Sequence, residues 1–266
     1  MTSFNKLKLQ HPRCDVLGVR VSALNMGSAL DLSDRLIATR ECGYVCVTGV
    51  HGVMEAQNDP KFKQILNHSF MNIPDGQPMT WVGRLQGFND MSRVYGPDFM
   101  IELCERSVER GYRHFLYGGN EGVAELLKTT LLKRIPGLNI VGTYTPPFRP
   151  LNADEEREFK TMLEELQPDI LWVGLGTPKQ ERFMFKYSGN LDVPLMVGVG
   201  AAFDINSGRT KDAPHWIKQS GLQWLHRLLQ EPRRLAKRYL INNPKFLFLI
   251  TLQFIGVKFA AGDQTA

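Results

Sequence analysis

Short apolar runs alternate with longer amphipathic stretches along most of this chain, and this alternation restricts the fold more than any other feature. Strands are predicted at residues 15–21, 44–48, 70–73, 113–117, 138–141, 170–174 and 195–199. Helical periodicity is clearest at residues 28–41, 98–110, 121–134 and 153–166. Strands that alternate with helices build βαβ units. We therefore expect an α/β fold with a mostly parallel sheet flanked by helices.

The length and apolar content allow one sizeable core, since 43% of the 266 residues are hydrophobic. No apolar run reaches the roughly 20 residues that span a bilayer, and residues 1–10 contain lysines but no apolar segment of a secretory signal. The cysteines form no C-x-x-C pair and lack further zinc ligands at a useful spacing. We therefore expect buried, reduced thiols of a cytoplasmic protein at Cys14, Cys42, Cys46 and Cys104.

Positive charge is concentrated at the C-terminal end. Residues 211–258 contain nine Lys and Arg against two acids, whereas residues 1–210 contain 23 basic and 24 acidic side chains. This asymmetry predicts a near-neutral core at 1–210 and a basic helical appendage at 211–266. A basic end favours an anionic partner: a membrane surface, a nucleic acid or a phosphorylated substrate. A solvated basic helical face is the alternative.

The appendage also has its own periodicity. Three leucines share a helical stripe: Leu222, Leu225 and Leu229. Pro232 suits the first turn of the next helix, and Pro244 is predicted to open a third segment. Residues 246–257 follow with no charge, in a run too short to span a bilayer. This pattern favours a foot that lies on a membrane surface, and a helical pair packed on the core is the alternative.

Glycine-rich or polar turns follow several predicted strands, at residues 48–52, 74–76, 118–122, 174–178 and 198–202. In an open α/β sheet, ligands gather at the carboxyl ends of the strands. Gly118 and Gly119 lie between a strand and a helix, where backbone N–H groups can face a phosphate. A purely structural turn explains these two glycines equally well.

Asp75 and Arg93 are the first candidates for chemistry. Asp75 lies in a Pro-Asp-Gly turn after an apolar run, where its carboxylate could take a proton from an attacking hydroxyl. A plain Pro-Asp-Gly turn is the alternative. Arg93 precedes a glycine-containing bend and could clamp a diphosphate, or it could form a surface ion pair with Asp98.

Three further polar residues follow predicted strands. His51 could act as an acid, a base or a hydrogen-bond donor near neutral pH, or it could be structural. Gln180 and Glu181 are expected in the first turn of a helix that starts with Pro178 at its first position. For Glu181, a favourable interaction with the helix dipole is the alternative.

Several motifs are absent from the sequence. It contains no Asp-x-Asp, H-E-x-x-H, Walker A or G-x-S-x-G motif, and no G-x-G-x-x-G after the first strand. Metal-dependent, hydrolase, P-loop and ordinary dinucleotide-binding functions therefore lose support. No RNA-binding aromatic motif accompanies the basic end, which argues against a nucleic-acid partner.

Seven sequence blocks follow one another along the chain: 73–76 (IPDG), 93–98 (RVYGPD), 115–119 (FLYGG), 174–181 (GLGTPKQE), 198–200 (GVG), 221–228 (GLQWLHRL) and 231–234 (EPRR). In this order they resemble the WecG/TagA/CpsF family of bacterial glycosyltransferases. A weaker match, 17–19 (LGV), precedes them, and the resemblance extends from about residue 18 to residue 248.

The resemblance implies a Rossmann-like core and an inverting, metal-independent transfer with no cofactor. The donor would be a UDP-sugar, often UDP-N-acetylmannosamine, and the acceptor a polyprenyl-diphosphate-linked saccharide for a surface polysaccharide. It also implies an appendage that touches the cytoplasmic face of the bacterial membrane, helps to complete the active site, and links membrane binding to a homo-oligomeric state.

Carried over residue by residue, the resemblance makes Asp75 the general base and Arg93 a catalytic arginine, needed for activity near the acceptor or diphosphate. Gln180 corresponds to a pocket glutamine. Arg227 and Arg234 correspond to appendage arginines that neutralise the departing UDP, and Lys237 stands where a third arginine is usual. Relatives carry Thr-x-Asn where this chain has Thr48 followed by Gly-Val-His, so the role of that asparagine passes to His51 or is absent. A non-catalytic lipid-diphosphate-binding or scaffold protein of the same fold is the rival hypothesis.

Overall fold

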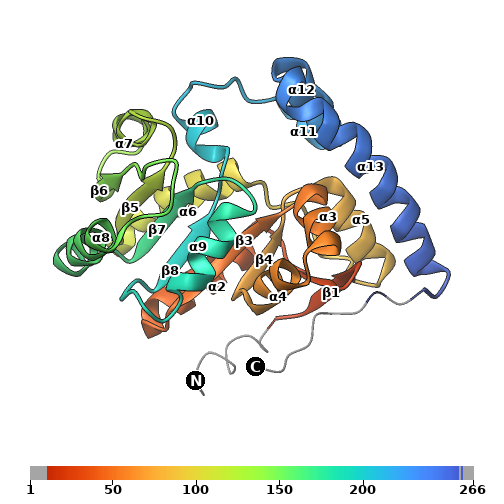
Figure 1. Ribbon diagram of the computed structural model, residues 1–266, viewed down its shortest axis with the longest axis horizontal. Helices are drawn as coiled ribbons and strands as arrows, with labels where there is room; N and C mark the ends of the chain where they lie inside the picture. The colour runs from red at the N-terminus through yellow and green to blue at the C-terminus, as the bar shows by residue number, and fades with distance from the viewer. Residues whose placement is uncertain (1–10, 258, 260–266) are drawn as a thin grey trace.

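A six-stranded parallel sheet forms the centre of the computed structural model, which describes residues 11–257 and 259 (Figure 1). The strand order is β4-β3-β8-β7-β5-β6. The strands are β3 (Gly43–Thr48), β4 (Met71–Pro74), β5 (Arg113–Gly118), β6 (Asn139–Tyr144), β7 (Ile170–Gly174) and β8 (Leu195–Gly198). The predicted α/β fold is confirmed, and each of these strands overlaps a predicted one.

Helices cover both faces of the sheet because strand side chains alternate between two apolar clusters. In β3, Val45 joins one cluster, whereas Tyr44 and Cys46 join the other. The first cluster includes residues of α2 (Met26–Thr39), α6 (Gly96–Arg110), α7 (Val123–Arg134) and α10 (Ala202–Asn206). The second includes residues of α3 (Val50–Asn58), α4 (Pro60–His68), α5 (Gln77–Leu85), α8 (Ala153–Leu166) and α9 (Lys179–Tyr187).

The prediction of a single strand at residues 15–21 is wrong. This segment forms an antiparallel hairpin of β1 (Arg13–Val16) and β2 (Val19–Ser22). Leu17 and Gly18 form the turn with φ angles of 55° and 81°, and the carboxylate of Asp15 accepts a hydrogen bond of 2.6 Å from the Gly18 N–H. Two successive left-handed residues reverse the chain in a two-residue hairpin, for which Gly18 was the one local signal in the sequence.

The C-terminal segment consists of α11 (His215–Gln219), α12 (Gln223–Gln230) and the long α13 (Pro232–Phe254), which lie to one side of the sheet (Figure 1). The prediction that Pro244 opens a third segment is wrong, because α13 continues through it. A proline leaves the carbonyl four residues earlier without a helical partner. That residue here is Leu240, which is 66% exposed.

The long helix α13 is attached to the rest of the molecule along its length. Leu235, Phe246 and Ile250 are buried, and the side chain of Gln253 hydrogen-bonds to the hairpin, 2.7 Å from the backbone N of Leu17 and 2.9 Å from the carbonyl oxygen of Asp15. The division at residue 210 stays a prediction. Throughout the described residues, every helix falls short of the length and apolarity that crossing a membrane requires.

The cysteines lie as expected. Cys14, Cys46 and Cys104 are buried and Cys42 is partly buried, all as free thiols. Burial raises the pKa of the Cys14 thiol to about 12. Such thiols are unreactive, which agrees with a role in packing.

Candidate active site

A cavity of about 1120 Å³ opens at the carboxyl end of the parallel sheet. Its floor is formed by the turns after β3, β4, β5, β7 and β8, and α12 and α13 form its opposite wall. In open α/β sheets, ligands bind at the carboxyl ends of the strands. The cavity therefore brings the predicted strand-end residues together with the basic C-terminal segment.

Asp75 lies directly after β4 and lines the cavity. Its backbone N–H donates to the carbonyl oxygen of Thr48 at 3.0 Å, and its Oδ1 accepts from the Gly96 N–H at 3.0 Å. Burial raises the pKa of the Asp75 carboxyl, while Arg93, the Gly96 N–H and Arg227 oppose this shift. A carboxylate that is fixed in position by hydrogen bonds and has a raised pKa has the properties of a general base.

Arg93 connects this turn to the C-terminal segment. Its Nε donates to the carbonyl oxygen of Asp75 at 2.8 Å, and its Nη1 donates to the carbonyl oxygen of Lys218 at 3.2 Å. Its Nη2 contacts the side-chain oxygen of Gln223, and its guanidinium lies over the ring of Tyr95, 4.4 Å from the centroid. Arg93 lines the cavity and does not form the ion pair with Asp98 that was the predicted alternative.

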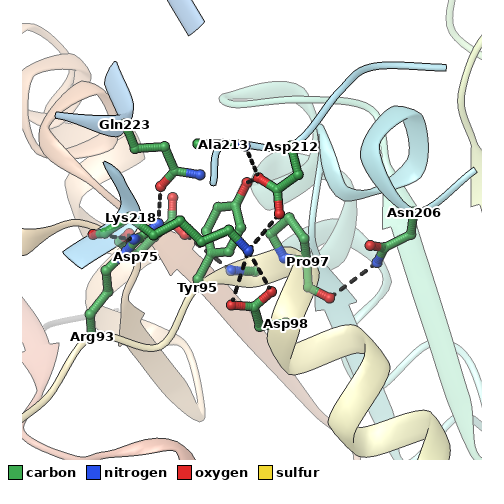
Figure 2. A network of polar contacts seen from close by, with 11 residues as sticks. Asp75, Arg93, Tyr95, Pro97, Asp98, Asn206, Asp212, Ala213, Lys218 and Gln223 are labelled. Atoms are coloured by element: carbon green, nitrogen blue, oxygen red, sulfur yellow. Dashed lines mark hydrogen bonds and ion pairs between the residues drawn. The ribbon is translucent and has the colours of Figure 1, made fainter. Parts of the chain in front are cut away.

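Asp98 instead pairs with Lys218, whose Nζ lies 3.1 Å from Oδ1 of Asp98 and 2.5 Å from Oδ2 of Asp212. Figure 2 shows this ammonium group between the two carboxylates and above the ring of Tyr95. The hydroxyl of Tyr95 donates to Asp212 at 3.0 Å. Sequence analysis did not predict this network, although Tyr95 and Asp98 lie in the same sequence block, residues 93–98, as Arg93.

Gln180 and Glu181 lie in the first turn of α9, as predicted, but Pro178 is its N-cap rather than its first residue. Gln180 lines the cavity, and its Oε1 accepts from the Gly176 N–H at 3.1 Å. Glu181 is 1% exposed and lies behind the cavity wall. Its Oε1 accepts from Gln180 at 3.0 Å and from Thr177 at 2.8 Å, and burial raises its pKa. Glu181 therefore orients Gln180 and does not itself face the cavity.

The two candidate glycines differ in their surroundings. Gly119 lines the cavity and donates its N–H to the carbonyl oxygen of Gly174 at 3.0 Å. Gly118 has a φ of +116°, and a Cβ there would lie 2.8 Å from the backbone of Gly174. A side chain would therefore clash with the neighbouring strand. Gly118 permits close packing of β5 and β7, so a structural role, rather than phosphate binding, explains this glycine.

The two candidates at the carboxyl end of β3 also differ. Thr48 is 2% exposed and supports the Asp75 turn through its carbonyl oxygen. His51 lines the cavity from the first turn of α3. Burial, assisted by Arg238, lowers the pKa of His51 to about 4. Its ring is therefore neutral at physiological pH, and its 3.7 Å contact with Glu55 is not an ion pair there.

Three arginines of the C-terminal helices line the cavity: Arg227, Arg234 and Arg238. The first two were predicted. Lys237 is exposed and lies outside the cavity, whereas its neighbour Arg238 lines it. Sequence periodicity could have found Arg238, because it lies four residues after Arg234 and so shares its helix face. Burial lowers the pKa of Arg238, and Arg227 and Arg234 add to this effect.

The charge of the cavity indicates the kind of ligand it suits. Eight cationic side chains line it, against the carboxylates of Asp75 and Asp204. Four of the eight also pair with acids outside the lining: Arg149, Arg182, Lys186 and Arg234. Among the described residues, no group of three or more His, Cys, Asp or Glu side chains is arranged to hold a metal ion. The arginine cluster would be relieved of its mutual repulsion by a ligand with several negative charges, such as a diphosphate.

Comparison with known proteins agrees with this chemistry. The sequence model described as the glycosyl transferase WecG/TagA/CpsF family matches residues 14–259. A protein of Bacillus spizizenii is 30% identical over 193 residues, which cover 73% of this chain and 72% of that protein. A protein of Bacillus subtilis is 26% identical over 227 residues, covering 85% and 86% respectively. Both are named N-acetylglucosaminyldiphosphoundecaprenol N-acetyl-beta-D-mannosaminyltransferase.

Proposed function

This chain belongs to the WecG/TagA/CpsF family of glycosyl transferases, and we propose that it transfers a sugar from a UDP-sugar to a polyprenyl-diphosphate-linked saccharide with inversion and without a metal ion. One observation carries this proposal. Asp75, a carboxyl group with a raised pKa, lines the same cavity as the cluster of Arg227, Arg234 and Arg238. A base for the acceptor and positive charge for a departing diphosphate are the two requirements of such a transfer.

In the proposed reaction, the carboxylate of Asp75 accepts the proton of the acceptor hydroxyl. The hydroxyl oxygen attacks the anomeric carbon of the donor sugar, and the bond from that carbon to the UDP oxygen breaks. The bonding electron pair leaves on the β-phosphate, where the three arginines stabilise the new charge. A single displacement from the face opposite the leaving group inverts the anomeric centre.

Arg93 has a positioning role in this proposal. Its hydrogen bonds to Asp75, Lys218 and Gln223 hold the turn of the base against the C-terminal helices. Its charge also favours the ionised form of Asp75. Gln180, held by Glu181, would present the edge of its amide to the sugar or diphosphate.

The acceptor class is inferred from the relatives, whose printed name contains a diphosphoundecaprenol. We propose further that α12 and α13 place the enzyme on the cytoplasmic face of the cell membrane. Exposed apolar side chains on α13 support this, among them Leu240, Phe248 and Phe254, with Arg233, Lys237 and Lys245 exposed on the same helix. Apolar and basic groups together favour a surface of anionic lipid.

A transfer assay tests the proposal. A short polyprenyl-diphosphate-sugar acceptor is incubated with a panel of UDP-sugars in the presence of a metal chelator, and the product mass is measured. We expect a gain of one sugar residue with one class of donor. Binding of acceptor and UDP without transfer by any donor would instead favour the non-catalytic lipid-diphosphate-binding alternative. Transfer that stops when chelator is added would contradict the metal-independent step.

A further inference from the structure

Lys218 lies outside the cavity but joins the C-terminal segment to the core. Its ammonium group contacts Asp98, in the first turn of α6, and Asp212, in the chain that leads into α11 (Figure 2). The same group lies 4.8 Å from the centroid of the Tyr95 ring. The side chain of Lys218 is 17% exposed. An exposed ion pair contributes little, whereas removing one partner from a shielded pair is costly.

The backbone of Lys218 is held as well. Its carbonyl oxygen accepts a hydrogen bond of 3.2 Å from Arg93, whose Nε donates to the carbonyl oxygen of Asp75. Gly96 donates its N–H to the carboxylate of Asp75. Both the carbonyl and the ammonium group of Lys218 are therefore attached to residues 93–98, the segment that also positions Asp75.

The position of α12 depends on these polar contacts. The helix has one buried side chain, that of Gln223, which is polar. The side-chain oxygen of Gln223 contacts Arg93. A helix that buries no apolar side chain gains little from packing on a core. The contacts of Lys218 and Gln223 therefore determine where α12 lies, and with it the cavity-lining Arg227.

We propose that Lys218 is a positioning residue, which holds α12 so that Arg227 faces Asp75 across the cavity. The inference rests on the proposed function, in which Arg227 stabilises the diphosphate and Asp75 is the base, and it adds what keeps these two groups together. Arg227 opposes the rise in the pKa of the Asp75 carboxyl, so the two charges are near enough to interact. Lys218 itself touches neither Asp75 nor the cavity.

Removal of the ammonium group would do more than delete an attraction. Asp98 belongs to the core, and Asp212 belongs to the C-terminal segment. Without a cation between them, their carboxylates would repel each other at this junction. Lys218→Met keeps most of the side-chain length and turns the attraction into a repulsion. Lys218→Arg keeps the charge, and a guanidinium group can bind both carboxylates.

Hydrogen exchange on the full chain tests whether Lys218 holds α12. We expect amide exchange in residues 223–230 to be at least about tenfold faster in Lys218→Met, because α12 opens locally. Exchange in β3, β7 and β8 should be unchanged, and Lys218→Arg should behave as wild type. The edge-to-face contact of Trp224 with Tyr239 keeps α12 attached to α13, so the overall fold should be retained.

Lys160→Met is the matched control. Lys160 on α8 also pairs with a carboxylate, that of Glu156 at 3.3 Å, and also lies over an aromatic ring, that of Tyr187 at 5.9 Å. It lies outside the cavity, and its substitution should leave exchange in α12 unchanged. Wild-type exchange of α12 in Lys218→Met, or equal acceleration across the sheet, would overturn the inference.

A double-mutant cycle tests whether Lys218 acts through Arg227. Calorimetry measures the Kd for UDP in wild type, Lys218→Met, Arg227→Ala and the double variant. We expect each single substitution to weaken binding about tenfold, and Lys218→Met to add less than about twofold once Arg227 is absent. Lys218→Arg should restore most of the affinity. Additive effects in the double variant, unchanged affinity in Lys218→Met, or equal weakening by Lys160→Met would overturn the inference.

The inference and the proposed reaction can fail separately. Faster exchange in α12 with non-additive UDP binding, in a protein that transfers no sugar, would support the role of Lys218 and contradict the reaction. Sugar transfer by the wild-type protein, with exchange and UDP affinity unchanged in Lys218→Met, would support the reaction and overturn the role of Lys218.

Discussion

Nε of Arg93 donates a hydrogen bond to the backbone carbonyl oxygen of Asp75 at 2.8 Å. The same guanidinium reaches Lys218 and Gln223 in the C-terminal segment. The turn that carries the proposed base is therefore connected to the helices that carry the arginine cluster. A movement of α11 or α12 would be transmitted to Asp75 through one side chain.

Asp75→Asn should reduce transfer by a factor of roughly 10² to 10⁴, because the amide cannot accept the hydroxyl proton. Its side-chain oxygen can still accept from the Gly96 N–H, so the fold and UDP affinity should be retained. Turnover and UDP binding are measured on the same preparation. Wild-type turnover in this variant would contradict the assignment of the base.

The same variant has an expected effect on stability. Burial raises the pKa of Asp75 above its ordinary value of 3.8. The folded state thus binds more protons than the unfolded state between these two values, and this residue's contribution to stability falls as pH rises through that window. Asp75→Asn should be more stable than wild type at pH 7 and lose this advantage near pH 3, as measured by urea denaturation.

Arg238→Ala and Lys237→Ala form a matched pair. Arg238 lines the cavity, whereas its neighbour Lys237 is exposed outside it. We expect Arg238→Ala to lower turnover and UDP affinity roughly tenfold to a hundredfold, because a donor to the departing diphosphate is lost. Lys237→Ala should stay within about twofold, since an exposed charge outside the site contributes little. The reverse order of effects would favour the position implied by the family resemblance.

The sheet was predictable because its signals are local. A buried parallel strand is a short run of apolar residues. Each of the six can be recognised in the sequence without knowing which strands lie beside it in the sheet. The hairpin of β1 and β2 was not, since its turn needs a left-handed conformation at Leu17, which a leucine rarely adopts, and Gly18 is the only turn-forming residue there. The continuity of α13 through Pro244 depends on the solvent exposure of the preceding turn, which a sequence does not show.

Which residues lie near the site was predictable from the sequence, but the direction in which their side chains point was not. Asp75, Arg93, His51 and Gln180 line the cavity as expected, because carboxyl ends of parallel strands meet at one edge. Glu181, which also lies at this edge, faces away from the cavity. The network around Lys218 joins residues more than 100 positions apart, and no local pattern relates such partners.

His51 should contribute to the loss of stability in acid. Burial and Arg238 lower its pKa from 6.5 to about 4. Between these values the unfolded state binds more protons, so stability falls as pH decreases from 6.5 to 4, by at most about 3 kcal/mol for this residue. His11 and His114, whose pKa values burial also lowers, add to the same slope.

His51→Gln should therefore flatten, without abolishing, the decline of the urea midpoint between pH 6.5 and 4. Glu55→Gln is the control, because the 3.7 Å contact of Glu55 with a neutral ring should contribute little. A carboxylate partner favours the protonated ring, so losing it would steepen the slope through His51 and not flatten it. Flattening by Glu55→Gln as large as that by His51→Gln would therefore contradict the assignment of this slope to His51.

The exposed face of α13 should bind anionic membranes. Leu240 and Phe248 are 66% and 64% exposed on that helix, and two introduced carboxylates would oppose both insertion and attraction to anionic lipid. Leu240→Glu combined with Phe248→Glu should reduce flotation with phosphatidylglycerol vesicles about tenfold. Leu126→Glu on α7, which changes an exposed leucine on a helix that packs on the sheet, is the control.

Measuring the turnover of this double variant on soluble and on vesicle-embedded acceptors distinguishes an effect on membrane binding from an effect on catalysis. Neither Leu240 nor Phe248 lines the cavity, so activity on a short, water-soluble polyprenyl-diphosphate acceptor should remain near wild type. Activity on the same acceptor embedded in vesicles should fall with the loss of flotation. Equal loss on both acceptors would mean that these side chains support the docked position of α13 over the cavity and not a membrane contact.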